Sequence, residues 1–450
     1  MPLRNPNEQD KKSKSTFDKK YAQEALKLHA YYKGKTATTL KCPVRSFEDF
    51  SIWYTPGVAA PCIAIKDSPE EVYNLTNKGN TIAVISDGSR VLGLGNIGPQ
   101  AGLPVMEGKC LLFKYLGGVD AVPIMLEVDH PDDFVETVLR LQPGFGGINL
   151  EDIAQPKCFR ILERLQKEAH IPVWHDDQQG TATVTLAGLI NALKVVGKKK
   201  EDIRITFIGT GAAGIACSRM IFSWGVDPRQ AVMVDEKGIL GRYRQDISPD
   251  SPAWELCQTT NPDGLKGGIR EALETADVAI AYSTPGPGII QPEWIKNMAN
   301  DPIIFACANP VPEIWPWEAK EAGAAIIATG RSDFDNQVNN SLCFPGIFRG
   351  VLDVRASRIT DEMCFAAAKA LAEAIGDNLD DTHILPKMMD MIIYPLQAAA
   401  VGMMAQEQGL AQRKMRYGQL LDHADSLISQ AQFTTDLLMR EGVIPPASAG

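Results

Sequence analysis

The sequence lacks any apolar run long enough to cross a membrane as a helix. Its longest candidate, residues 388–404, is interrupted by Asp390 and Pro395 and falls short of the roughly 18 apolar residues that such a helix needs. The chain also lacks an excess of positive charge, because it contains 45 Lys and Arg against 55 Asp and Glu, which gives a formal net charge of -10. We therefore expect neither a membrane protein nor a protein whose general role is to bind nucleic acid.

Closely spaced cysteines are absent as well. The nine cysteines are scattered, their number is odd, and no two are separated by just two residues. This usage argues against a disulfide framework or a zinc site, and it is typical of the reducing cytoplasm. The first twenty residues are polar and lack the apolar stretch of a secretory signal. We expect a cytoplasmic protein with a solvated tail at residues 1–22.

What the sequence does contain is an ordinary globular composition. The chain has 450 residues, of which 45% are hydrophobic and 22% are charged. Since a single hydrophobic core rarely grows past about 250–300 residues, we expect two domains. Short apolar runs alternate with helical patterns, which predicts an α/β fold with parallel sheets.

The expected strands fall into two series, with the seam between the domains near residues 165–180. The first series comprises residues 81–86, 120–128, 147–150 and 171–174, and the second comprises 203–208, 231–234, 278–282, 303–308 and 325–328. Between the series, a helix over residues 181–196 should end at Gly197. From Thr360 onward the pattern is helical.

A glycine-rich turn opens the second series. It follows an apolar strand, precedes an apolar helical pattern and reads Gly209-Thr210-Gly211-Ala212-Ala213-Gly214. The first glycine would make the tight turn, the second would let the backbone approach a pyrophosphate, and the third would let helix and strand pack closely. Asp235, 21 positions after Gly214, could accept hydrogen bonds from ribose hydroxyls. The pattern predicts a site for NAD, although three nearby bases leave NADP possible: Lys237, Arg242 and Arg244.

Two acidic pairs lie just past expected strands. Glu151-Asp152 follows one strand and Asp176-Asp177 follows the next. Adjacent parallel strands would bring the pairs together, and carboxylates gathered without Cys or His suit Mg²⁺ or Mn²⁺. Each pair taken alone is better explained as a helix cap or a solvated turn, so the metal site stays one of two open interpretations.

Other side chains could act on a substrate. Arg90 lies in a turn after a strand, where its planar fork could grip a carboxylate. Lys109 is expected at the start of a helix, where the dipole would lower its pKa toward that of a usable base, although a surface lysine is the alternative. Turns or loops carry Tyr54, Asn309 and Asn340, for which packing or turn roles are also open.

Taken together, these motifs make the sequence resemble the malic enzymes, specifically their shorter bacterial type. The matching stretches occur in family order at residues 54–59, 86–102, 105–109, 149–153, 175–182, 209–214, 308–310, 329–333, 336–340 and 344–350. The resemblance implies an N-terminal α/β substrate domain and a Rossmann-like, doubly wound dinucleotide-binding domain. Their expected bounds are 23–170 and 171–410, with a helical extension at 411–450.

The resemblance also implies a reaction, the metal-dependent oxidative decarboxylation of L-malate to pyruvate and CO₂ with reduction of NAD(P). It makes Lys109 the general base, Tyr54 the general acid and Asp176 a neighbouring acid that could pair with the lysine. The implied metal ligands are Glu151, Asp152 and Asp177. The implied substrate contacts are Arg90, Asn309 and Asn340, with Asn309 also near the cofactor.

A homodimer is implied too, in which Tyr54 could act across the interface. Three alternatives remain open at this point. They are a dehydrogenase for another 2-hydroxy acid, oxaloacetate decarboxylation as a partial activity, and a non-catalytic protein that binds NAD.

Overall fold

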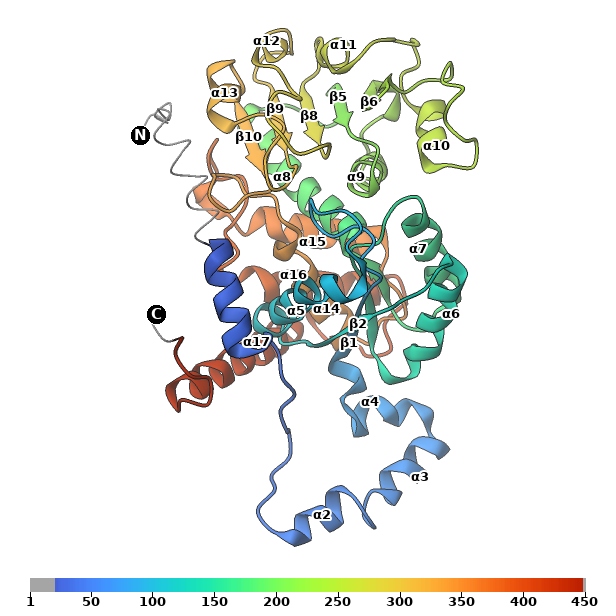
Figure 1. Ribbon diagram of the computed structural model, residues 1–450, viewed down its shortest axis with the longest axis vertical. Helices are drawn as coiled ribbons and strands as arrows, with labels where there is room; N and C mark the ends of the chain where they lie inside the picture. Colours follow the sequence, from blue (N-terminus) through green and yellow to red (C-terminus); the bar gives the residue numbers. More distant parts are fainter. Residues whose placement is uncertain (1–20, 448–450) are drawn as a thin grey trace.

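Two β-sheets organise the chain in the computed structural model, which describes residues 21–447 (Figure 1). The tail expected at residues 1–22 lies almost wholly outside the described residues. Within the described part of the chain, no helix is both long and apolar enough to span a membrane.

The first sheet contains four strands in the order β2-β1-β3-β4, and its pairs are parallel. The strands are β1 (Thr81–Ser86), β2 (Asp120–Met125), β3 (Gly147–Leu150) and β4 (Val173–His175). β3 is buried along its whole length, as in a parallel sheet that is covered on both faces. Because the four strands run in the same direction, the segments that follow them meet at one edge of the sheet.

The second sheet has six strands in the order β10-β9-β8-β5-β6-β7, and β7 alone runs antiparallel to its neighbour. The strands are β5 (Ile205–Ile208), β6 (Ala231–Asp235), β7 (Gly238–Ile239), β8 (Val278–Ala281), β9 (Ile303–Ala306) and β10 (Ile326–Thr329). The chain moves to one side of β5 and then to the other, which makes the switch point where doubly wound sheets bind their ligands. The predicted fold class is confirmed.

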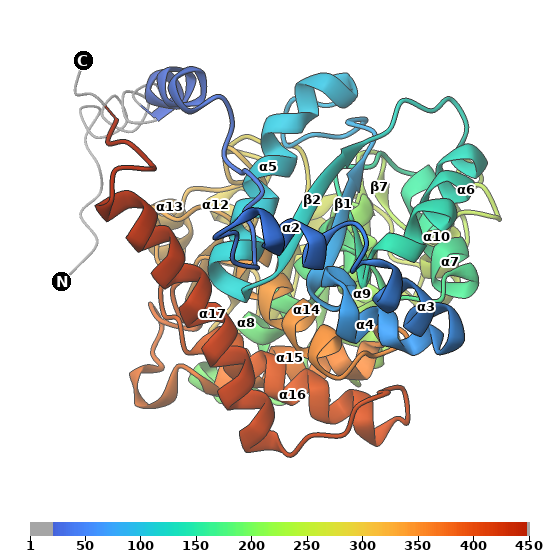
Figure 2. The same cartoon turned by 90° about the horizontal axis from the view of Figure 1, so that it is seen from below.

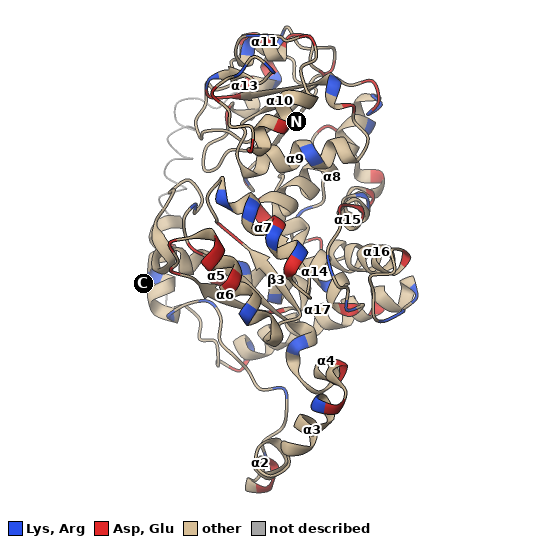
Figure 3. Ribbon diagram, turned by 90° about the vertical axis from the view of Figure 1, so that its right-hand side faces the viewer, with Lys and Arg blue, Asp and Glu red and all other residues tan. Residues whose placement is uncertain are grey.

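Helices cover both faces of the first sheet. α6 (Pro131–Leu141) and α7 (Lys157–Glu168) pack together on one face, and α5 (Gly98–Gly117) lies on the other. α7 buries its apolar side chains at helical spacing. Residues of both charges alternate along the same helix (Figure 3).

Helices from the last part of the chain return to the first sheet. They are α14 (Phe344–Asp353), α15 (Asp361–Glu373), α16 (Ile393–Glu407) and α17 (Tyr417–Arg440). Both α14 and α17 pack against α5, and α17 runs along one side of the molecule (Figure 2). The residue bounds expected for the domains stay a prediction, because these helices follow the second sheet in sequence but pack beside the first.

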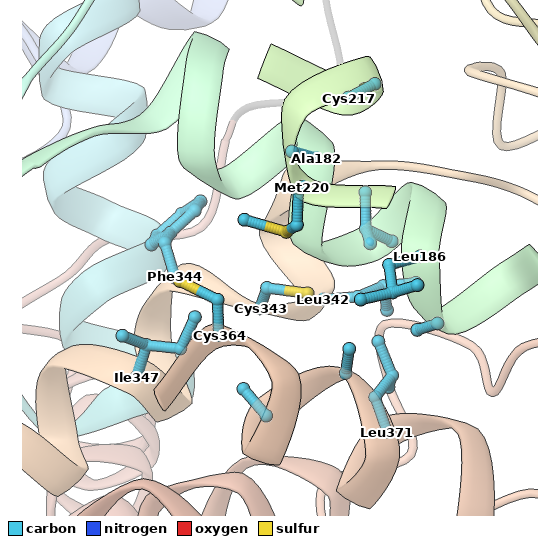
Figure 4. Packing of buried hydrophobic residues seen from close by; sticks show 14 of the residues in the cluster. Ala182, Leu186, Cys217, Met220, Leu342, Cys343, Phe344, Ile347, Cys364 and Leu371 are labelled. Carbon is cyan, nitrogen blue, oxygen red and sulfur yellow. The ribbon is translucent and has the colours of Figure 1, made fainter. Parts of the chain in front are cut away.

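A continuous apolar core joins the two halves of the molecule. α8 (Thr181–Val196) packs against α9 (Ala212–Ser223) and α15. Leu186 of α8 and Met220 of α9 share this core with Phe344 at the start of α14 (Figure 4). The seam between the sheets is therefore packed rather than bridged by a bare linker.

A helical projection leaves the body near the start of the chain (Figure 1). It contains α2 (Phe47–Trp53), α3 (Ala59–Asp67) and α4 (Val72–Leu75), and we call residues 42–75 the arm. No residue of α3 is buried, even though the helix includes Ile63.

Two element boundaries differ from the predictions by more than two residues. The helix expected to begin near Lys109 begins at Gly98 and continues through Pro104. The Gly- and Pro-rich sequence suggested a loop, but Pro99 lies in the first turn, where a missing N–H is tolerated. The second expected strand ends at Met125 rather than at residue 128.

Candidate active site

The carboxyl ends of the first sheet open onto a cavity of about 910 Å³ that also reaches the second sheet. This volume is in the range that holds a small ligand together with part of a cofactor. The structure brings ten of the predicted site residues to this cavity: Arg90, Lys109, Glu151, Asp152, Asp177, Asn309 and Asn340, together with Gly211, Ala212 and Ala213 of the glycine-rich turn. They come from segments that are distant in sequence, so the cavity exists only in the folded chain.

Three carboxylates converge in this cavity. Glu151, Asp152 and Asp177 can each offer an oxygen so that the three atoms lie within 4.8 Å of one another. They follow the neighbouring strands β3 and β4, as the sequence predicted, and the backbone N–H of Asp152 donates to Asp177 Oδ2 at 2.8 Å. Asp152 Oδ2 is buried and has no hydrogen-bond partner among the described residues.

Burial and mutual repulsion disfavour the charged forms of these acids. Burial and the neighbouring Asp177 raise the pKa of Asp152 to about 8. Burial also raises the pKa of Glu151 and that of Asp177. A divalent cation would relieve both effects, and an all-oxygen donor set suits Mg²⁺ or Mn²⁺. The residues present therefore fit the predicted metal ion.

Lys109 lies in the middle of α5 with its side chain buried. Its Nζ donates to Asp176 Oδ2 at 2.6 Å and lies 3.1 Å from Glu151 Oε1. Burial lowers the pKa of Lys109, but the charges of Asp176 and Glu151 raise it further, so the net direction is upward. The predicted lowering by the helix dipole is wrong, because the dipole acts on the first turn and Lys109 lies well beyond it.

Asp176 is held in place on several sides. It is fully buried, and the indole Nε1–H of Trp174 donates to its Oδ1 at 3.1 Å. A Cβ at Gly180 would lie 2.0 Å from the same oxygen, so this position requires glycine. The other oxygen pairs with Lys109, so Asp176 fixes where the lysine points.

A second cavity, of about 880 Å³, follows the glycine-rich turn and shares Arg90 and Gly211 with the first. A Cβ at Gly209 would lie 2.3 Å from the carbonyl oxygen of Tyr282, and one at Gly214 would lie 2.0 Å from that of Gly209. A Cβ at Gly211 would meet nothing within 4 Å. The first and third glycines therefore serve the turn and its packing, while the second leaves open space at the N-terminus of α9.

Asp235 ends β6 at this second cavity and is already paired. Arg244 donates to its two carboxylate oxygens at 2.9 and 2.7 Å. The same guanidinium donates to both oxygens of Asp246, at 2.7 and 2.9 Å. One arginine thus offsets the charge of the acid that is predicted to contact the ribose.

Tyr54 lies apart from both cavities. It follows α2 on the arm, and 72% of its surface is exposed. It lines neither cavity, so the structure does not bring the predicted acid and the predicted base together within one chain.

Glu313 is a site residue that the sequence analysis missed. It is fully buried, and Oε1 accepts hydrogen bonds from the backbone N–H and the hydroxyl of Ser283, at 2.8 and 3.1 Å. Oε2 accepts from the backbone N–H of Ala308 at 3.0 Å. Glu313 therefore ties together the loops after β8 and β9, which carry Ser283 and Asn309 into the cavity. The only signal in the sequence is an acid shortly after the Asn309-Pro310 turn.

We predict that Glu313→Gln destabilises the protein by an amount that depends on pH. Burial raises the pKa of Glu313 to about 6 from an ordinary 4.5, so its stabilising contribution is full below pH 4.5 and declines as the pH rises through 6. The loss of stability in the variant should therefore be about 2 kcal/mol smaller at pH 7 than at pH 4.5. Denaturant unfolding of both proteins across this range measures it. The exposed Glu293→Gln is the matched control, and a loss that stays constant with pH would contradict the assignment.

Comparison with known proteins agrees with this geometry. Residues 178–405 match the family model "Malic enzyme, NAD binding domain", and residues 33–131 and 128–166 match "Malic enzyme, N-terminal domain". The chain is 50% identical over 390 residues to the bifunctional malic/malolactic enzyme of Bacillus subtilis (strain 168), which covers 86% of this chain and 94% of that protein. It is also 50% identical over 382 residues to the NAD-dependent malic enzyme of Geobacillus stearothermophilus, covering 84% and 78% respectively.

A solved structure shows the same arrangement. The crystal structure of Entamoeba histolytica malic enzyme superimposes with a TM-score of 0.94 and 46% sequence identity, covering 99% of this chain and 93% of that one. The similarity thus extends over both sheets and the C-terminal helices. The chain belongs to the malic enzyme family.

Proposed function

We propose that this protein is an NAD(P)-dependent malic enzyme, which oxidises and decarboxylates L-malate to pyruvate and CO₂. The observation that carries the proposal is that one cavity joins the buried pair of Lys109 and Asp176, three convergent carboxylates and the glycine-rich turn. A proton acceptor, a cation site and a hydride acceptor are the three parts that this reaction needs.

Different residues of the chain would bind the substrate, accept its proton and return a proton to the product. The guanidinium of Arg90 and the amides of Asn309 and Asn340 line the cavity and would hold the substrate carboxylates. Lys109 would accept the C2 hydroxyl proton as C2 gives up a hydride to the dinucleotide, and Asp176 would keep the lysine aimed at that oxygen. Loss of CO₂ from C4 leaves C3 in need of a proton, which Tyr54 would supply.

The carboxylates of Glu151, Asp152 and Asp177 would hold a divalent ion. When bound, the ion supplies Lewis-acid polarisation of substrate oxygens and offsets the negative charge that keeps Lys109 protonated. This proposal accounts for acids that are costly to bury together without a cation.

A direct assay tests the reaction. Purified protein is incubated with L-malate, NAD or NADP, and Mg²⁺, Mn²⁺ or a chelator, while reduced cofactor and CO₂ are measured. We expect equal amounts of both products and no turnover with chelator. Equal oxidation of L-malate and of a 2-hydroxy acid without a β-carboxylate, such as L-lactate, would favour the alternative dehydrogenase.

The unpaired cysteines support a cytoplasmic location for this activity.

We infer that the working unit is a homodimer in which the arm of one chain reaches the cavity of the other. The arm exposes several large apolar side chains, among them Phe47, Trp53 and Ile63. Large apolar side chains that are exposed together on one projecting segment are typical of an interface. A second copy of the chain would cover it and would also explain why Tyr54 stands apart from Lys109.

Mixing inactive chains tests this sharing. Tyr54→Phe and Lys109→Ala chains should each be inactive, but a mixed dimer would contain one intact site and one doubly altered site. Unfolding, mixing and refolding equal amounts should therefore restore about a quarter of the wild-type activity, because half of the dimers are mixed. Activity that stays at the level of the separate variants would place Tyr54 and Lys109 in the same chain. Mixing each variant with itself is the control.

We expect Arg244, which pairs with Asp235, to let the chain bind either NAD or NADP. In the Asp235→Asn variant the carboxylate that would repel a 2′-phosphate is gone, and Arg244 is freer to pair with that phosphate. We expect the ratio of kcat/KM for NADP to that for NAD to rise about tenfold, which corresponds to about 1.4 kcal/mol. Asp227→Asn, which breaks a similar pair with the exposed Arg229, should leave the ratio unchanged. An unchanged ratio in Asp235→Asn would remove Asp235 from cofactor selection.

A further inference from the structure

A fully buried histidine, His175, ends β4 directly before Asp176-Asp177. Its side chain points to the same face of the sheet as that of Val173, because side chains two positions apart on a strand share a face. That face is packed with apolar side chains, among them Val173 itself and Leu150 of the neighbouring strand. An imidazole therefore lies in an otherwise apolar layer of the first sheet.

Neither ring nitrogen of His175 has a hydrogen-bond partner among the described residues. The backbone N–H of His175 donates to Gln179 Oε1 at 3.1 Å, so its backbone is held while its ring is not. Burial lowers the pKa of His175 to about 4, so the ring is neutral near pH 7 and carries one N–H donor and one acceptor nitrogen. Burying these two groups without partners costs free energy, and such an exception in a folded protein needs a reason.

A carboxylate of the candidate active site lies close to the ring. Nδ1 of His175 is 3.8 Å from Asp177 Oδ2, just beyond hydrogen-bonding distance. The same oxygen accepts from the backbone N–H of Asp152 at 2.8 Å. Because Asp177 is one of the three convergent carboxylates, the unpartnered imidazole lies beside a proposed ligand of the cation.

We propose that His175 positions Asp177 for cation binding by donating its Nδ1–H to Asp177 Oδ2. This inference rests on the proposed function, because it takes the three carboxylates as the cation site. An approach of about 1 Å forms the bond. Oδ2 then accepts from two N–H groups, those of His175 and Asp152, which leaves Oδ1 for the cation. Hydrogen bonds of this kind orient a ligating carboxylate, and losing one at a metal site typically costs about 10–100-fold in metal affinity.

Two replacements of His175 separate a hydrogen-bond donor from a side chain that only fills space. His175→Leu keeps a side chain of similar size but removes both ring nitrogens, whereas His175→Asn places an amide N–H close to the position of Nδ1. We expect His175→Leu to weaken Mn²⁺ binding about 10–100-fold and His175→Asn to weaken it less than about threefold. Titration of the full chain with Mn²⁺, followed by electron paramagnetic resonance, measures the affinity without substrate or turnover.

Thermal unfolding shows whether a replacement damages the fold. In chelator, His175→Leu should unfold at a temperature equal to or above that of the wild type, because it no longer buries unpaired polar groups. Added Mn²⁺ should raise Tm of the wild type more than that of His175→Leu. His170→Leu, which replaces an exposed histidine shortly before the same strand, should follow the wild type in affinity and in Tm. If His175→Leu fails to fold, His175→Gln serves, because its amide lies near the position of Nε2 rather than Nδ1 and should not restore the affinity.

A double-variant cycle tests whether His175 acts through Asp177. Asp177→Ala removes the carboxylate that the histidine is proposed to orient. In that background, His175→Leu should weaken Mn²⁺ binding by less than about twofold more, because nothing is left to position. A merely structural role of His175 would give the same loss of affinity in both backgrounds.

The possible failures are distinguishable. A wild-type protein that binds no Mn²⁺ would overturn the proposed cation site and this inference with it. Equal affinities of the wild type and His175→Leu would overturn the role of His175 and leave the cation site in place. Equal losses in His175→Leu and His175→Asn would also overturn it, because a donor near Nδ1 would then make no difference.

Discussion

Lys109→Ala should lower kcat for L-malate oxidation by about 10²–10⁴-fold, the range that a positioned general base contributes. Among the described residues, two lysines line the active-site cavity, Lys35 and Lys109, and the substitution removes Lys109. The Nζ of Lys35 already donates to the backbone oxygen of Pro104. Steady-state assays measure the loss of kcat. They are run at saturating Mg²⁺, because the substitution leaves the carboxylates of Glu151 and Asp176 without their lysine partner and the cation would offset their charge.

Two further measurements separate a lost base from a damaged fold. Methylamine added to Lys109→Ala should restore part of the lost rate, because it supplies an amine where the side chain was. Lys167→Ala, which removes an exposed lysine that pairs with Glu163, should keep full activity. Near-normal malate oxidation by Lys109→Ala would exclude the lysine as the base.

Asp177→Asn should weaken the binding of Mn²⁺ by more than the roughly 10–100-fold that outer-shell changes at metal sites cost. The asparagine oxygen can still accept from the backbone N–H of Asp152, so the local fold is kept while one anionic ligand is lost. Titration of free Mn²⁺ followed by electron paramagnetic resonance measures the affinity without substrate or turnover.

The same variant has an opposite effect on the metal-free protein. Burial raises the pKa of Asp177, so its charged form is disfavoured at neutral pH, and a neutral side chain should unfold at an equal or higher temperature in chelator. Added Mg²⁺ should raise Tm of the wild type and have little effect on the variant. Asp202→Asn, an exposed control, should follow the wild type. An unchanged affinity for Mn²⁺ in Asp177→Asn would remove it from the ligand set.

Much of the active site could be predicted because its signals are local. Glu151-Asp152 and Asp176-Asp177 each follow a short buried strand, and parallel strands bring such segments to one edge. The glycine-rich turn is similar, since Gly209 and Gly214 each lie against a nearby backbone oxygen. These predictions needed only the order of strands and turns along the chain.

The errors came from contacts that no local pattern encodes. Lys109 and Asp176 are 67 positions apart, and their pairing reverses the pKa direction that the position of Lys109 in its helix suggested. Glu313 was missed for the same reason, because it acts by accepting hydrogen bonds from Ser283, 30 positions earlier in the loop after β8. Tyr54 shows a further limit of sequence analysis. The residue lies on the exposed arm, and its surroundings depend on which surface covers that arm.

The sequence by itself determined the class of the fold, the succession of nine strands along the chain, the dinucleotide turn and the family, because periodicity, turn chemistry and motif order are properties of neighbouring residues. The tertiary structure alone decided which charges meet. It paired Lys109 with Asp176 and Asp235 with Arg244, and among the described residues it left Asp152 Oδ2 without a hydrogen-bond partner. The physical reason is that Coulomb and desolvation energies depend on distance and burial in space, and the folded chain sets both.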